Sequence, residues 1–180
     1  MNRKNQTVNL VMTGLCIAIG IVLPMAFHSV PNAGSVILPM HIPVLLCGLI
    51  CGPIYGLAAG ILTPALSSLL TQMPPMAYLP SMLCELAIYG LVAGLAIRLI
   101  RTKSNAANVY LSLVAAMLCG RVIYGIVNAL IFQAGKYSME LWVTASFVTA
   151  LPGIIIQLVA IPVLVLLLQK AGLIRNVQCA

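Results

Sequence analysis

The stretch His41–Leu70, HIPVLLCGLICGPIYGLAAGILTPALSSLL, decides the fold class, because it stays largely apolar over thirty residues. A helix that crosses a bilayer needs about 20 mostly apolar residues. The dipeptide Gly52-Pro53 interrupts the stretch and is typical of one helix ending and another beginning. We therefore predict two successive membrane helices. The first is too short to cross upright and needs the preceding loop to complete its crossing.

The whole chain has the composition of a membrane protein. Of its 180 residues, 62% are hydrophobic and only 6% are charged. Soluble domains carry about 25% charged residues and roughly 45–50% apolar ones, so the composition argues against a soluble enzyme or a disordered chain. The net charge of +7 would suggest nucleic-acid binding in a soluble protein. In a membrane protein it fits cytoplasmic loops instead, and we expect no nucleic-acid partner.

Further apolar runs complete the predicted fold. The first run follows Arg3 and Lys4 and resembles a signal peptide, but it has no clear cleavage pattern, so we expect a retained helix. The fold class predicted is all-α, a polytopic membrane protein with one domain over residues 1–180. Its six transmembrane helices are expected roughly over residues 8–25, 41–51, 54–70, 78–99, 109–132 and 142–168.

The basic residues predict the orientation of this bundle. With six crossings, seven of them fall on one side of the membrane: Arg3, Lys4, Arg98, Arg101, Lys103, Lys170 and Arg175. Lys136 is left on the opposite side, and Arg121 lies within a span. Because Lys and Arg gather in cytoplasmic loops, both termini are predicted to be cytoplasmic.

Two charged residues, Glu85 and Arg121, lie within predicted spans. A charge at the bilayer centre costs at least ~2.5–3.5 kcal/mol, so such residues usually face the bundle interior or a cavity. At 1.5 Å per residue, Glu85 lies ~10 Å and Arg121 ~16 Å from the outer ends of their helices. The two residues are thus at comparable depth. They either pair with each other or bind a solute, and the sequence leaves both alternatives open.

Helical spacing gathers further polar side chains around this pair. Steps of three and four residues place Tyr78, Ser81, Glu85 and Tyr89 on one face of the fourth helix. The same steps place Arg121, Tyr124 and Asn128 on one face of the fifth. His41 begins the second helix. These faces predict a polar cup that opens outward, with the candidate solute-binding residues Glu85, Arg121, Tyr78, Tyr124, Asn128, His41 and Gln157.

The sequence lacks motifs for nucleotide binding and catalysis. It contains no G-x-x-x-x-G-K-[ST] loop, so it cannot bind ATP by that route, and no H-E-x-x-H or G-x-S-x-G signature. The six cysteines do not have metal-ligand spacing. We expect no enzymatic activity, no metal and no cofactor.

Small residues recur at four-residue spacing and allow helix backbones to approach closely in lipid. Gly14 and Ala18 form such a pair on the first helix. Packing within the bundle accounts for most of these pairs. An interface with a partner subunit is the alternative for one of them.

Three runs resemble a known family of membrane proteins. They are HIPVLLCGLICGPIYGL (41–57), CELAIYGLVAG (84–94) and GRVIYG (120–125). Together with six helices in under 200 residues and a long first outer loop, they resemble the substrate-binding S component of energy-coupling factor (ECF) vitamin transporters. The resemblance covers nearly the whole chain.

The resemblance implies a bacterial plasma-membrane protein that captures a vitamin from outside. It would work with a transmembrane coupling (T) subunit and two ABC ATPases. Family members typically dock the coupling subunit through an Ala-x-x-x-Ala arrangement on the first helix. This chain has Gly14 and Ala18 there, so the role transfers with a departure.

The identity of the solute stays open. Arg121 favours a carboxylate or phosphate, as in a pantothenate-like solute, whereas Glu85 favours a pyridoxine-like or hydroxymethylpyrimidine-like one. Two other classes of function compete with the S component. A proton-coupled transporter would use Glu85 as proton carrier. An intramembrane enzyme would need a richer set of catalytic groups than one membrane carboxylate.

Overall fold

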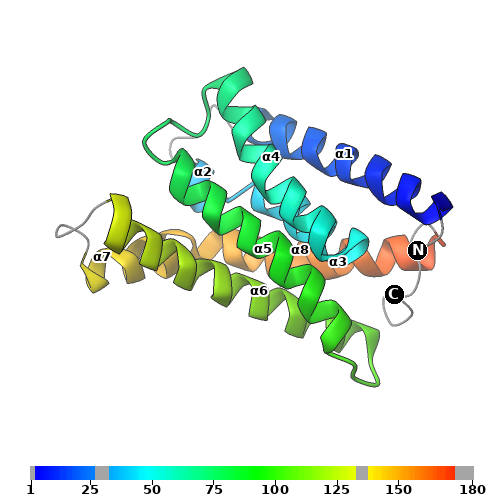
Figure 1. Cartoon of the computed structure of the whole chain (residues 1–180). Helices are drawn as coiled ribbons and strands as arrows, with labels where there is room; N and C mark the ends of the chain where they lie inside the picture. Colours follow the sequence, from blue (N-terminus) through cyan, green and yellow to red (C-terminus); the bar gives the residue numbers. More distant parts are fainter. Residues whose placement is uncertain (1–2, 27–32, 133–137, 173–180) are drawn as a thin grey trace.

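The computed structural model describes residues 3–26, 33–132 and 138–172, and every regular element within them is helical (Figure 1). Six helical segments are long and apolar enough to cross a membrane. They are Gln6–Ala26, Gly34–Cys51, Pro53–Thr71, Leu79–Leu99, Asn105–Leu130 and Leu151–Lys170. The all-α fold with six membrane-spanning helices is therefore confirmed.

The elements follow in the order α1 (Arg3–Ala26), α2 (Ala33–Val36), α3 (His41–Cys51), α4 (Pro53–Thr71), α5 (Leu79–Leu99), α6 (Asn105–Val127), the π-helix η1 (Asn128–Phe132), α7 (Met139–Val143), the π-helix η2 (Thr144–Thr149) and α8 (Leu151–Lys170). The start of α1 and the end of α8, the termini of the described chain, lie at the same end of the bundle (Figure 1). We call the opposite end, where α2, α7 and the connection between α4 and α5 lie, the distal end.

Helix α5 lies at the centre and packs against α3, α4 and α6. Helix α8 packs against α3 and α6, and α1 packs on α3 and α4. The main core cluster combines side chains from four of these helices, among them Leu45, Tyr89, Leu113 and Ile161. Helix α1 is the least enclosed span, with only 17% of its residues buried.

Glycines let α4 and α5 approach unusually closely. A Cβ on Gly90 would collide with the backbone of Gly56, and one on Gly60 would collide with the carbonyl group of Leu86. No side chain on the partner helix could yield, because the atoms met are backbone. These small residues therefore form an internal seam, in the manner of small-xxx-small packing in membranes.

The junction between α3 and α4 is built on Gly52. Its φ of 98° lies in the region that side chains disfavour, and its N–H donates to the carbonyl oxygen of Gly48 at 3.0 Å. The guanidinium of Arg98 lies where a Cβ of Gly52 would be. Pro53 follows at the first position of α4, where its missing N–H costs nothing.

The last predicted span differs from the observed elements. The region 142–168 is not one helix, because α7 ends at Val143, η2 ends at Thr149 and α8 begins at Leu151. Pro152, at the start of α8, has no N–H to continue the hydrogen-bond ladder of the preceding helix. The short second helix is indeed preceded by a separate turn of helix, α2, and the two together make the span Gly34–Cys51.

Helices α1 and α6 begin before their apolar runs, whereas α5 begins at Leu79, one residue after the predicted start. Helix α1 starts at Arg3, five residues before the predicted 8–25, and α6 starts at Asn105 rather than at 109. Hydropathy marks the part of a helix that lies in lipid, whereas polar residues at its ends can still be helical. At its far end, α6 changes to the π-helix η1 at Asn128, whose side chain bonds to the backbone of its own helix.

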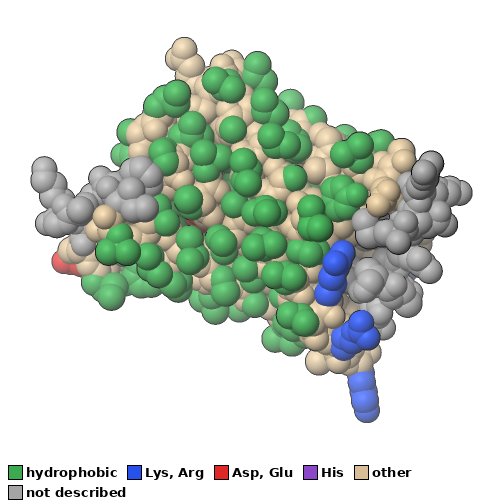
Figure 2. Space-filling model, viewed as in Figure 1, with side chains coloured by type: hydrophobic (Ala, Val, Ile, Leu, Met, Phe, Trp, Pro, Cys, Tyr) green, Lys and Arg blue, Asp and Glu red, His purple; other side chains and the backbone are tan. Residues whose placement is uncertain are grey.

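Exposed basic side chains gather near one end of the bundle. Hydrophobic side chains cover most of the face seen in Figure 2, with Lys and Arg side chains near the end that holds the termini. Among the basic residues whose side chains are described, Arg98, Arg101, Lys103 and Lys170 are exposed and Arg121 is buried. Lys136 and Arg175, on which the predicted orientation also depends, lie outside the described residues.

Candidate functional site

Three ionisable side chains meet inside the bundle. An Arg121 guanidinium nitrogen, Nη1, lies 3.0 Å from Oε1 of Glu85. Nε2 of His41 lies 3.7 Å from the other carboxylate oxygen, Oε2, which is too long for a hydrogen bond. The three side chains are 7%, 4% and 1% exposed for Arg121, Glu85 and His41 respectively. A buried ion pair thus holds α5 to α6, with a histidine of α3 beside it.

The helices bring these residues together from separate parts of the chain. His41 is the first residue of α3, Glu85 lies in the distal half of α5, and Arg121 lies in the distal half of α6. The ring of Tyr89, one turn below Glu85, meets the His41 ring edge-on with centroids 5.2 Å apart. Gly120 makes this possible, because a Cβ there would collide with the Tyr89 ring.

Many polar atoms around the ion pair are buried without a hydrogen-bond partner in the described part of the chain. They include both ring nitrogens of His41, Nε and Nη2 of Arg121 and the Tyr89 hydroxyl. The Ser146 hydroxyl in η2 and both amide atoms of Gln157 in α8 are likewise buried and unpartnered there. A native interior leaves few such groups, and each costs about 1–3 kcal/mol if it stays unpaired. Their concentration at one place marks a site for a polar ligand or water.

Gln157 is a buried residue of α8, the helix that packs against α2 and α3. Gly153, one turn earlier on α8, lies against the carbonyl groups of Val36 and Ile37. His41 follows Ile37 by four residues, and both Gln157 and His41 are almost completely buried. Helix α8 also packs against α6, which carries Arg121.

Two predicted residues of α6 lie on its distal side of Arg121. Asn128 is buried, and its side-chain nitrogen donates to the carbonyl oxygen of Tyr124 at 2.8 Å. Tyr124 is partly buried. One amide hydrogen of Asn128 is therefore bonded within its own helix. Asn128 has fewer hydrogen-bonding groups available for a ligand than Gln157, whose amide atoms are both unpartnered.

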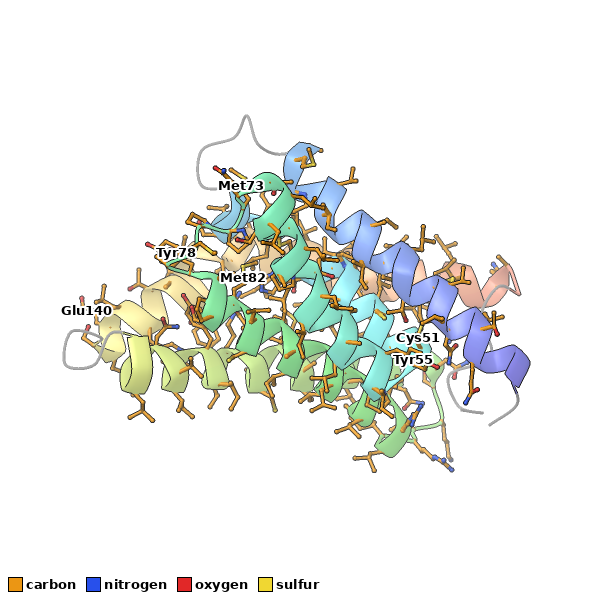
Figure 3. The ribbon with its side chains drawn as sticks, turned by 45° about the horizontal axis from the view of Figure 1, so that its top comes forward. Cys51, Tyr55, Met73, Tyr78, Met82 and Glu140 are labelled. Carbon is orange, nitrogen blue, oxygen red and sulfur yellow. The ribbon has the colours of Figure 1, made fainter. Side chains whose placement is uncertain are left out.

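Tyr78 lies apart from this cluster. It precedes α5, at the end of the connection from α4, and is 58% exposed (Figure 3). Its predicted helix-mates Ser81, Glu85 and Tyr89 are all buried. The structure therefore brings together three of the seven predicted site residues, His41, Glu85 and Arg121. It places Tyr124 and Asn128 distally on α6, Gln157 within α8, and Tyr78 at the distal surface.

Sequence reasoning did not assign two features of the site. The Ser146 hydroxyl is fully buried in η2, and its separation of eleven residues from Gln157, about three helical turns, was the available signal. The indole Nε1 of Trp142 donates to the backbone carbonyl oxygen of Arg121 at 3.0 Å. Trp142 also packs on Gly125 and edge-on against Phe147. No sequence pattern predicts a bond between α7 and the backbone of α6.

A cavity of about 350 Å³ lies between α6 and α7, beside Trp142. Its lining is apolar except for Ser138 and includes Val122, Gly125 and Ile126. None of the predicted site residues lines it. Within the described ranges, no group of three His, Cys, Asp or Glu residues could hold a metal ion.

A family comparison supplies the context for this buried polar cluster. The family model described as "ECF transporter, substrate-specific component" matches residues 8–165. The chain belongs to this family. Comparisons with curated proteins and with solved structures return no match.

As an ECF substrate-specific component, the chain is a membrane-embedded, substrate-binding subunit for uptake. Such components are transporter subunits rather than enzymes, and they function with a T subunit and ATPases. The S component described here presents Gly14 and Ala18 on the exposed face of α1, and a Cβ on Gly14 would meet no atom within 4 Å. Gly20 is the inward-facing small residue, packed against Thr63 and Pro43.

Proposed function

We propose that this S component is the high-affinity binding subunit for uptake of a small water-soluble vitamin or vitamin precursor in an ECF-type ABC importer. The observation that carries the proposal is the buried set of unpartnered polar atoms around Glu85 and Arg121. A solute that bonds to these atoms offsets their desolvation cost, so binding is strong for a solute of matching shape and weak for others.

The proposed site consists of His41, Glu85, Arg121 and Gln157 at its centre, with Tyr124 and Asn128 on its distal side. Tyr78 is proposed to contact the solute on its way in, because it lies at the distal surface. The solute enters from the distal end, which we assign to the cell exterior. The exposed basic residues at the opposite end support this orientation, because Lys and Arg are concentrated on the cytoplasmic side.

We also propose that α1 docks the T subunit through Gly14 and Ala18, in a complex with two ABC ATPases in a bacterial plasma membrane. Both residues lie on the exposed face of α1 rather than in the seam against α3 and α4. An internal packing role would require neighbouring atoms around Gly14, and the described structure has none within 4 Å. Close approach of helices in lipid depends on such small residues.

Reconstitution into liposomes tests this function. We expect the chain alone to bind solute without accumulating it, because it has no nucleotide-binding loop. With a T subunit, two ATPases and internal ATP, the same vesicles should concentrate the vitamin. Uphill uptake by the chain alone, driven by a proton gradient and independent of ATP, would instead show a self-sufficient proton-coupled transporter.

A further inference from the structure

We propose that the solute carries a carboxylate, and that this carboxylate binds the Nε–Nη2 edge of Arg121 while Nη1 remains paired with Glu85. This inference rests on the proposed function and names the chemical class of its solute. It also joins the two roles that the sequence left as alternatives, because one guanidinium can serve the protein and the solute through different nitrogens.

The first step of the argument is the geometry of Arg121. A guanidinium is planar and presents its N–H donors in a rigid fork, so two parallel N–H groups along one edge match the two oxygens of a carboxylate. Nη1 of Arg121 lies 3.0 Å from Oε1 of Glu85. Nε and Nη2 form the other edge, and both are buried without a partner in the described residues. The two N–H groups along that edge are therefore arranged to bind both oxygens of a carboxylate.

The second step is the balance of donors and acceptors. Arginine nitrogens can only donate, and an ionised carboxylate can only accept. The carboxylate of the site, Glu85, already faces Arg121 on one side and His41 on the other. Unpartnered donors, Nε and Nη2 of Arg121 and the amide nitrogen of Gln157, outnumber the unpartnered carboxylate and amide acceptors, Oε1 of Glu85 and Oε1 of Gln157. A solute group that mainly accepts hydrogen bonds is the matching partner.

The third step is charge. Glu85 and Arg121 cancel each other, so a solute carboxylate adds one negative charge to a buried site. His41, whose Nε2 lies 3.7 Å from Oε2 of Glu85, is the basic side chain beside the pair, and an imidazole N–H can donate a hydrogen bond to an anion. Tyr89, whose ring packs against the His41 ring, is another titratable side chain in contact with His41. The arrangement thus accommodates a monocarboxylate better than a cation, which would lie against Arg121.

The test is ligand titration of the purified wild-type chain with matched pairs of solutes that differ only in the acidic group. Suitable pairs are pantothenate with panthenol, nicotinate with nicotinamide, and biotin with its methyl ester. The fluorescence of Trp142 reports binding, since it is the sole tryptophan and bonds to the Arg121 backbone. We expect the tightest ligand to carry a carboxylate and its neutral partner to bind roughly 10- to 100-fold more weakly, as for other hydrogen bonds to charged groups.

Arg121→Lys supplies the protein side of the test. Lysine keeps a positive charge for Glu85 but lacks the planar edge, so we expect the preference for the carboxylate over its neutral partner to fall about 10-fold or more. Gln157→Leu is a second variant that removes no existing hydrogen bond, and it should weaken carboxylate binding several-fold.

Each remaining outcome counts against the proposal. If the tightest ligand is neutral or cationic, such as pyridoxine or a hydroxymethylpyrimidine, the carboxylate assignment is wrong and the binding function stands. If neither the pairs nor these two solutes bind the wild-type chain, the proposed function fails together with the inference. Equal affinity within a pair, or full discrimination in Arg121→Lys, also overturns the inference.

Discussion

Arg121 is held in place through both its side chain and its backbone. Its guanidinium pairs with Glu85, and its backbone carbonyl oxygen accepts a hydrogen bond from the indole of Trp142. An arginine cannot lose its proton inside a protein, so its burial in a membrane bundle requires such partners. The second bond fixes the place from which the side chain extends.

Removing one member of the ion pair should destabilise the protein more than removing both. Arg121→Gln and Glu85→Gln each leave an uncompensated buried charge, which costs about 3–5 kcal/mol in proteins. The double change removes both charges and should recover much of that loss. Thermal unfolding of the three variants in detergent measures this coupling. Additive losses in the double variant would show that the two side chains do not stabilise each other.

At the residue scale, the sequence predicts which residues meet better than how they meet. Charges within apolar spans must face the interior, and helical spacing gives their depth, so the proximity of Glu85 and Arg121 was predictable. The choice between a protein ion pair and a solute contact was not, because it depends on side-chain orientation. Tyr78 shares a helical face with Glu85 but precedes the first turn of α5, where periodicity no longer determines burial.

The seam between α4 and α5 is the most tightly packed element contact. We expect Gly90→Ala to lower the stability by about 1–3 kcal/mol, because the added Cβ would meet the Gly56 backbone. Gly14→Ala is the matched control and should leave stability unchanged or slightly raised, since nothing surrounds that position. Thermal unfolding in detergent compares the two. Equal melting temperatures would mean that the helices can separate without cost.

Substitutions on the exposed face of α1 should impair docking of the T subunit without impairing solute binding. Gly14→Leu and Ala18→Leu are expected to abolish co-purification with the T subunit and transport, while leaving solute affinity nearly intact. Both side chains would project from the exposed face of α1. Cys119→Leu is a control that introduces the same side chain at an exposed position of α6, a helix outside the main contacts of α1. It should retain both activities.

The opposite pattern would contradict the docking assignment. If Gly14→Leu and Ala18→Leu lose solute binding and transport equally, the two residues belong to an internal seam of the bundle.

At the element scale, apolar runs and Gly-Pro punctuation predict where helices lie. Gly52-Pro53 divides α3 from α4 at the residue expected. The break before α8 was not predicted, because Ala150 and Pro152 lie in an uninterrupted apolar run, and a proline in such a run kinks a membrane helix more often than it ends one. The π-helices η1 and η2 likewise leave no mark in hydropathy.

At the scale of the whole molecule, charge and burial divide the bundle into two functional ends. The distal half holds the buried polar cluster, and exposed basic residues lie at the end that holds the termini. Composition and hydropathy were sufficient to predict a six-helix membrane protein, since few other folds tolerate 62% hydrophobic residues. The solute was not predictable, because donor and acceptor positions depend on how α3, α5, α6 and α8 pack together.

Mass spectrometry of the solute carried through purification tests the central claim, that the buried cluster around Arg121 binds a vitamin. The wild-type chain and the Cys119→Leu control should both carry the same small water-soluble vitamin or precursor, and Arg121→Gln should carry little or none. A wild-type chain that carries no solute from vitamin-supplemented cells, or an Arg121→Gln variant that carries as much as the wild type, would contradict the account.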